Sequence, residues 1–75
     1  MRVENRELFV AFWDDEVGAA VVALLIGWEG DDPSTLLPVV AYRFGIRTVL
    51  GGFLLFADRY EADAAAETPE IWEMM

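Results

Sequence analysis

The chain has 75 residues, the size of one small domain, and 56% of them are hydrophobic. Its 14 acidic and 5 basic residues give a net charge of −9, which disfavours direct binding to nucleic-acid phosphates and to anionic membrane surfaces. Cysteine and histidine are absent from the sequence, which excludes disulfides, thiolate metal sites and the commonest general base.

The N-terminal third contains one predicted strand and one ambiguous apolar run. Residues 7–13 are rich in aromatic side chains and predict a strand. Residues 17–28 are apolar throughout, so their periodicity does not separate helix from strand. The alanines and the acids that precede this run favour a helix, whereas Gly18 and the β-branched residues favour a strand in a meander. We expect the helix and keep the strand as the alternative.

A loop is predicted over residues 29–34, where glycine, proline and serine accompany acidic side chains. Asp32 can cap a single helical turn that starts at Pro33. We expect the acidic groups of this loop to lie in solvent.

The Gly-Gly pair at residues 51–52 predicts a β-hairpin between residues 39–50 and 53–57. The first arm alternates apolar and mixed positions with a period of two, as a half-buried strand does. Two glycines suit a primed two-residue turn, because both central residues need positive φ. In this arm Arg43 and Arg47 fall on the same side of the strand, roughly 13 Å apart.

Capping signals predict two helices near the C-terminal end. Asp58 can cap a helix over residues 58–67, and four alanines support that helix. Thr68 and Pro69 repeat a start signal and predict a second, short helix that carries Trp72.

Together these elements predict one small α+β domain over residues 1–75. Its antiparallel sheet contains the 39–50/53–57 hairpin and packs against one or two helices. The charged N-terminal segment 1–7 includes acids and precedes no cleavage pattern, so we expect no secretory signal and a cytoplasmic location.

Carboxylates are the only abundant reactive groups in the chain. They form two clusters, at residues 14–16 and 29–32, and neither has the spacing of a calcium-binding loop. The single serine, Ser34, has no histidine or lysine to serve as its base, because the chain lacks both. We therefore expect no catalytic residue, metal or cofactor, and keep a carboxylate- or metal-dependent hydrolase as an alternative.

The charge and the apolar excess favour binding to another protein that presents a basic surface. Trp72, in the terminal helix, suits docking onto such a partner. An arginine pair can also bind carboxylates of a partner, although the sequence favours ion pairing of these arginines with the chain's own acids, such as Glu4, Glu7 or Asp58. The residues expected at the interface are Asp14, Asp15, Glu16, Glu29, Asp31, Asp32, Arg43, Arg47 and Trp72.

The sequence thus predicts a non-enzymatic acidic interaction module, such as a viral or mobile-element inhibitor or a small accessory subunit. One version of this function mimics the charge of a nucleic acid and occupies a basic groove. A second alternative is a membrane-associated subunit anchored through residues 36–57, although two arginines near the middle of that run oppose insertion. A homo-oligomer is also left open.

Overall fold

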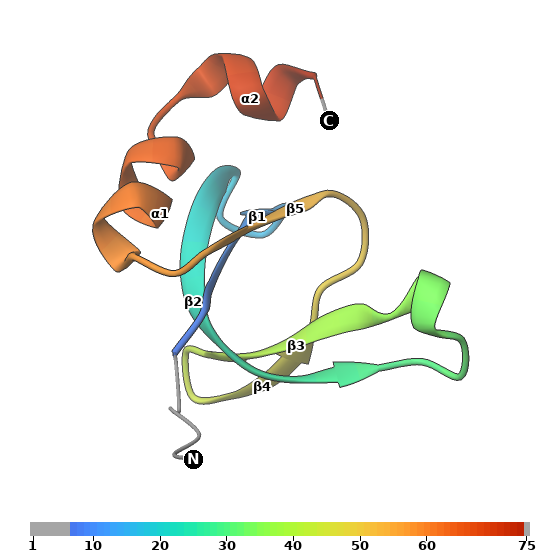
Figure 1. The fold of residues 1–75 in the computed structure, drawn as a ribbon. Coiled ribbons are helices and arrows are strands. Elements are labelled where there is room, and N and C mark those ends of the chain that lie inside the picture. Colours follow the sequence, from blue (N-terminus) through green and yellow to red (C-terminus); the bar gives the residue numbers. More distant parts are fainter. Residues whose placement is uncertain (1–6, 75) are drawn as a thin grey trace.

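The computed structural model describes residues 7–74 and contains a five-stranded antiparallel sheet with two short α-helices, which confirms the expected small α+β class (Figure 1). The expectation of no secretory signal depends on residues 1–7, of which residues 1–6 lie outside the described residues. The elements are β1 (Phe9–Asp14), β2 (Ala19–Glu29), a 3-10 turn η1 (Pro33–Thr35), β3 (Leu37–Tyr42), β4 (Gly45–Thr48), β5 (Phe53–Phe56), α1 (Arg59–Ala66) and α2 (Pro69–Glu73).

The sheet has the strand order β4-β3-β2-β1-β5, and every neighbouring pair is antiparallel. The long strand β2 pairs with β1 over residues 19–24 and with β3 over residues 24–29. Its register with β3 shifts between Leu25 and Gly27, and such a bulge bends a strand. β2 therefore curves from one layer into the other, so that β3 and β4 fold over β1 and β5 (Figure 1).

The helix expected over residues 17–28 is wrong, because this run forms the central strand β2 and the meander alternative is correct. Gly18 has φ +73° in the β1–β2 turn, and its amide donates a hydrogen bond of 2.8 Å to the Asp14 carbonyl. Val21 and Leu25 pack around the core on one face of β2, and α1 lies against the sheet on the other. A strand covered on both faces is apolar throughout, which removes the usual alternation.

The hairpin expected between residues 39–50 and 53–57 is also wrong. The first arm itself forms the hairpin β3–β4, whose two-residue turn is Arg43–Phe44. β5 pairs with β1 instead of continuing from β4. Gly51, with φ +92°, lies in the connection between β4 and β5. The pairing of β5 with a strand distant in sequence thus replaces the local pairing that the glycines predict.

The Arg43–Phe44 turn changes which side chains of the predicted arm face the core: even-numbered ones before the turn and odd-numbered ones after it. Val40 is buried before the turn, and its partner across the hairpin is Arg47. Val49 is buried after the turn, whereas Ile46 is 73% exposed. A single continuous strand would place the even-numbered side chains on one face throughout. For the same reason, Arg43 and Arg47 do not lie side by side on one strand.

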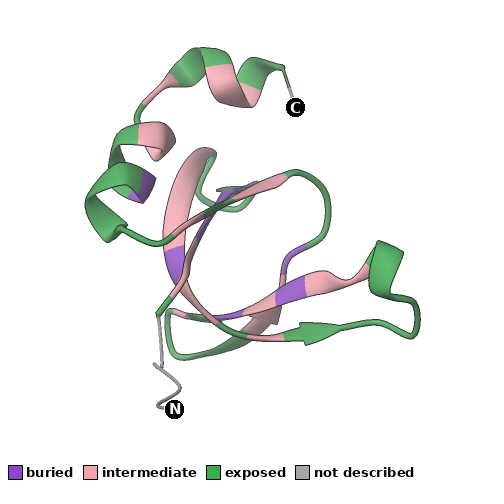
Figure 2. Ribbon diagram, in the orientation of Figure 1, coloured by how far each residue is buried: buried purple, intermediate pink, exposed green. Residues whose placement is uncertain are grey.

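The core lies between the two layers, and the buried residues concentrate on the strands (Figure 2). It contains Val10, Phe12, Ala23, Val40 and Val49. The candidate membrane anchor, residues 36–57, is divided among β3, β4, β5 and their connections. Within the described range 7–74, no helix has the length and apolar character needed to cross a bilayer.

Both helices expected near the C-terminal end are present. Asp58 caps α1, since its side chain accepts a hydrogen bond of 2.8 Å from the backbone amide two residues further on. Pro69 begins α2, but the Thr68 side chain does not cap it and donates instead to the Ala64 carbonyl at 2.9 Å. α1 lies against β1, β2 and β5, with Ala62 fully buried.

Candidate functional site

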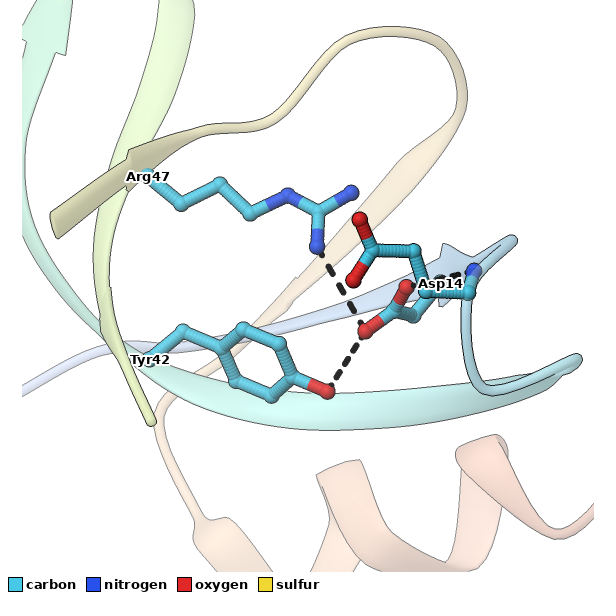
Figure 3. A network of polar contacts seen from close by, with 4 residues as sticks. Asp14, Tyr42 and Arg47 are labelled. Atoms are coloured by element: carbon cyan, nitrogen blue, oxygen red, sulfur yellow. Dashed lines mark hydrogen bonds and ion pairs between the residues drawn. The ribbon is translucent and has the colours of Figure 1, made fainter. Parts of the chain in front are cut away.

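A buried polar cluster joins the end of β1 to β3 and β4. The Asp14 side chain is fully buried, and its Oδ2 accepts a hydrogen bond of 2.7 Å from the Tyr42 hydroxyl (Figure 3). Arg47 Nη1 lies 3.4 Å from the same oxygen, and Asp14 Oδ1 accepts a hydrogen bond of 3.0 Å from the Glu16 amide. One carboxylate therefore ties the two layers of the sheet together and orders the β1–β2 turn.

Hydrogen bonding to the Asp14 carboxylate outweighs its burial. The Tyr42 hydroxyl is the main cause that lowers the pKa of Asp14; the Glu16 amide and the charge of Arg47 lower it further, and burial opposes them. Burial, followed by the bond to Asp14, raises the pKa of Tyr42. Around neutral pH, Asp14 is therefore ionised and Tyr42 is neutral.

Arg47 is held in this cluster by aromatic rings as well as by charge. Its guanidinium carbon lies 5.4 Å from the centre of the Phe12 ring and 5.8 Å from that of Tyr42, within the range of cation–π contacts. Within residues 7–74, every buried side-chain nitrogen or oxygen has a hydrogen-bond partner. The buried polar atoms of the cluster are thus satisfied by its own members, which indicates a structural tie, while 40% of the Arg47 side chain stays exposed.

Beside this tie, an open groove of about 630 Å³ lies between the β1–β2 turn, the β4–β5 connection and α2. The groove brings together three segments that are distant in the sequence. Its lining residues are Trp13, Asp15, Leu50, Gly51, Gly52, Pro69, Trp72 and Glu73.

Local structure explains how both indoles reach the groove. Side chains alternate along β1, so Trp13 faces away from the buried Asp14 and is 46% exposed. The half-buried Trp72 belongs to α2, and its Nε1–H donates a hydrogen bond of 3.0 Å to the Ala65 carbonyl of α1. This bond fixes α2 against α1 through the polar edge of the indole and leaves its apolar surface for the groove.

The groove combines apolar surface with negative charge. Leu50 is 78% exposed at its margin, a large fraction for a leucine. Asp15 and Glu73 contribute two exposed carboxylates, and no lining residue in the described part of the chain is basic. Carboxylates beside indole rings favour a guanidinium or ammonium group, which the rings attract by cation–π contact and the carboxylates by charged hydrogen bonds.

Two of the interface residues expected from the sequence, Asp15 and Trp72, meet in this groove. Asp14 is fully buried and therefore does not reach a partner, whereas Arg47, its ion-pair partner, keeps 40% of its side chain exposed. Arg43 lies apart from them in the exposed β3–β4 turn, where its guanidinium carbon is 5.4 Å from the centre of the Tyr42 ring.

The remaining acids expected at the interface, Glu16, Glu29, Asp31 and Asp32, are exposed outside the groove. Asp32 caps η1, as the sequence predicts: its Oδ1 accepts a hydrogen bond of 3.0 Å from the Ser34 amide, which lowers the pKa of Asp32. Among residues 7–74, acidic side chains do not gather in threes closely enough to hold a metal ion.

Six of the eight groove residues are not among those expected at the interface, namely Trp13, Leu50, Gly51, Gly52, Pro69 and Glu73. Trp13 belongs to an aromatic run that predicts a core strand, and Pro69 is a strong helix-start signal. Leu50 belongs to a regular apolar alternation. Each residue has a sufficient local explanation, so only the contact between distant segments reveals the site. The acid at position 14 is a misleading signal, because alternation with a solvent-facing acid would place Trp13 in the core, whereas Asp14 is the buried member of this pair.

Comparisons with protein-family models, with curated proteins and with solved structures found no match to this chain. The chemistry of the groove and the charge of the chain are therefore the observations from which a function is inferred.

Proposed function

We propose that this protein is a non-enzymatic cytoplasmic interaction module that binds a basic segment of another protein in the groove between Trp13 and Trp72. The observation that carries the proposal is that two acidic residues, Asp15 and Glu73, line the same groove as two indole side chains. An arginine or lysine side chain has both parts that this surface complements, an apolar stem and a cationic head.

A basic side chain can make two favourable contacts in the groove at the same time. The cation over an indole face contributes roughly 0.5–2 kcal/mol, depending on how far it is desolvated. A charged hydrogen bond to Asp15 or Glu73 adds to this contact and fixes the direction of the head group. Arginine is favoured over lysine because its planar guanidinium can stack on an indole and pair with a carboxylate together.

The charge of the whole chain supports the same proposal at longer range. A net charge of −9 attracts basic surfaces and raises the rate at which they arrive. Surfaces that bind nucleic-acid phosphates are rich in lysine and arginine and are therefore basic surfaces of this kind. In the nucleic-acid-mimic version of the function, the exposed acids steer such a surface and the groove binds one of its arginines.

A titration with hexaarginine tests the proposal. Binding is measured by calorimetry and by the indole N–H signals in NMR spectra. We expect the signals of Trp13 and Trp72 to shift, while that of Trp28, which does not line the groove, stays in place. The uncharged variant Asp15→Asn/Glu73→Gln should bind at least about tenfold more weakly, which corresponds to about 1.4 kcal/mol.

The matched control is Asp31→Asn/Glu67→Gln, which makes the same change in net charge at two exposed acids outside the groove. We expect this control to bind hexaarginine within about twofold of the original protein. Equal weakening of both double variants, or the absence of any peptide binding, would overturn the proposal.

A further inference from the structure

The tip of the β3–β4 hairpin carries the most exposed aromatic side chain in the described part of the chain. Phe44 is fully solvent-exposed, and Ile46, two residues later, is largely exposed as well. The neighbouring Arg43 has φ +57°, a left-handed conformation that costs free energy for a residue with a β-carbon. The turn therefore holds the Phe44 ring in solvent, while the guanidinium carbon of the neighbouring Arg43 lies 5.4 Å from the centre of the Tyr42 ring.

The tip and the groove are chemically complementary. The tip offers an aromatic ring and a positive charge, and the groove offers two indoles, the exposed Leu50 and two carboxylates. A volume of about 630 Å³ falls in the range of sites that hold small organic ligands, so it has room for a phenyl ring and part of an arginine side chain.

We propose that a second copy of this chain inserts its Arg43–Phe44 tip into the groove between Trp13 and Trp72, an inference that rests on the proposed function and names one partner of the same site. Phe44 contacts the indoles and Leu50, and Arg43 pairs with Asp15 or Glu73. At high protein concentration the groove would then be occupied by a second copy until a basic partner displaces the tip.

The position of the tip decides the kind of assembly. The β3–β4 turn and α2 lie at opposite ends of the molecule in Figure 1, so a chain does not fill its own groove. The contact uses two different surfaces, one from each copy, and each bound copy still presents a free tip or a free groove. A contact of this type adds copies head to tail rather than closing into a symmetric dimer.

The like net charges of two copies oppose this contact. At about 0.15 M salt the Debye length is roughly 8 Å, so repulsion between distant charges is screened while pairs in direct contact persist. We therefore expect a weak association that grows with protein concentration and that is clearer at moderate than at very low salt.

Sedimentation velocity of the full chain, from about 10 μM to about 1 mM, tests the inference with one variant on each surface. Phe44→Ser removes the tip, and Leu50→Arg places a cation in the groove; both positions are exposed, so the fold should be retained. Each variant alone should stay monomeric. An equimolar mixture should form a dimer and nothing larger, because one intact tip and one intact groove remain.

Tyr60→Ser is the matched control, since it removes another highly exposed aromatic ring, on α1, and should leave self-association unchanged. A monomer at every concentration, or association of either surface variant alone, would overturn the inference. Hexaarginine binding to Phe44→Ser separates the two proposals. If the peptide binds this variant while the original chain never associates, the proposed function stands and self-association is wrong.

Discussion

The Tyr42 hydroxyl donates a hydrogen bond of 2.7 Å to Asp14 Oδ2 and thereby joins the end of β3 to the end of β1. These strands are not neighbours in the sheet, because β2 lies between them. The bond therefore crosses the core from one layer to the other, and Arg47 reinforces it from β4. It also orders the β1–β2 turn, where Asp15 lines the groove.

Replacing Tyr42 with phenylalanine should destabilise the fold while keeping the packing of the ring. Tyr42→Phe leaves the buried Asp14 carboxylate without its strongest hydrogen bond, so we expect a loss of about 1–3 kcal/mol in the free energy of unfolding. Urea denaturation at neutral pH measures this loss. The exposed Tyr60 has no comparable buried partner to lose, so Tyr60→Phe should change stability by less than about 0.5 kcal/mol.

The buried carboxylate also predicts how stability depends on pH. The pKa of Asp14 is lower in the folded chain than its usual value of 3.8, so the unfolded state binds more protons in acid. The stabilisation is present above pH 3.8 and is lost as the pH falls through the folded pKa. Melting temperatures should therefore decline below about pH 4. At the alkaline end, the raised pKa of Tyr42 predicts a loss of stability as the pH rises above 10.

The same linkage gives Tyr42→Phe a characteristic pH profile. The tyrosine hydroxyl is the main cause of the lowered Asp14 pKa, so the variant should lose less stability on acidification than the original protein. The difference between the two proteins should shrink from pH 7 to pH 3. Parallel profiles over this range would show that the bond contributes nothing to the acid sensitivity.

The turn at residues 43–44 can be tested by one substitution. Arg43→Asn relieves the left-handed strain at this position but removes the guanidinium that lies 5.4 Å from the centre of the Tyr42 ring, so we expect the free energy of unfolding to rise by less than about 1 kcal/mol. Arg47→Asn should lower it, since this residue contacts Asp14 and two aromatic rings. If residues 39–50 formed one continuous strand, asparagine at position 43 would instead destabilise the protein.

The elements predicted correctly depend on signals that are local in the sequence. Asp58 and Asp32 accept hydrogen bonds from amides within two residues, and Pro69 needs only its own fixed φ to start a helix. The aromatic strand β1 also follows from a short run of side chains. For these elements, the residues that determine the conformation are the residues that adopt it.

The elements that the sequence predicts wrongly are those that depend on pairing between distant segments. A strand and a hairpin with a two-residue turn both show alternation, so residues 39–50 look continuous until the turn at 43–44 exchanges their faces. The glycine at position 51 does have positive φ, but in a connection that lets β5 reach β1. Packing of the core favours the pairing of β5 with β1, because Phe12 of β1 lies opposite Phe53 of β5 and both belong to or contact the core.

Part of the candidate site was also predictable from the sequence. An acidic surface and the terminal Trp72 follow from composition and position, and Asp15 was among the expected contacts. The groove itself depends on Trp13 facing away from the core and on the β4–β5 connection reaching α2. Neither relation has a local signal, since both follow from the exchange of faces and partners described above.

Salt dependence distinguishes binding in the groove from diffuse attraction by the acidic surface. We expect the Kd for hexaarginine to rise about tenfold between roughly 50 and 300 mM sodium chloride, because added salt weakens the attraction between the acidic chain and a peptide with several positive charges. Asp15→Asn/Glu73→Gln should reduce both the affinity and the slope of log Kd against log salt. Asp31→Asn/Glu67→Gln should keep the original slope, because its charges act only at a distance. If the two variants had the same slope, the peptide would be bound by the overall charge of −9, and the two carboxylates of the groove would have no specific part in recognition.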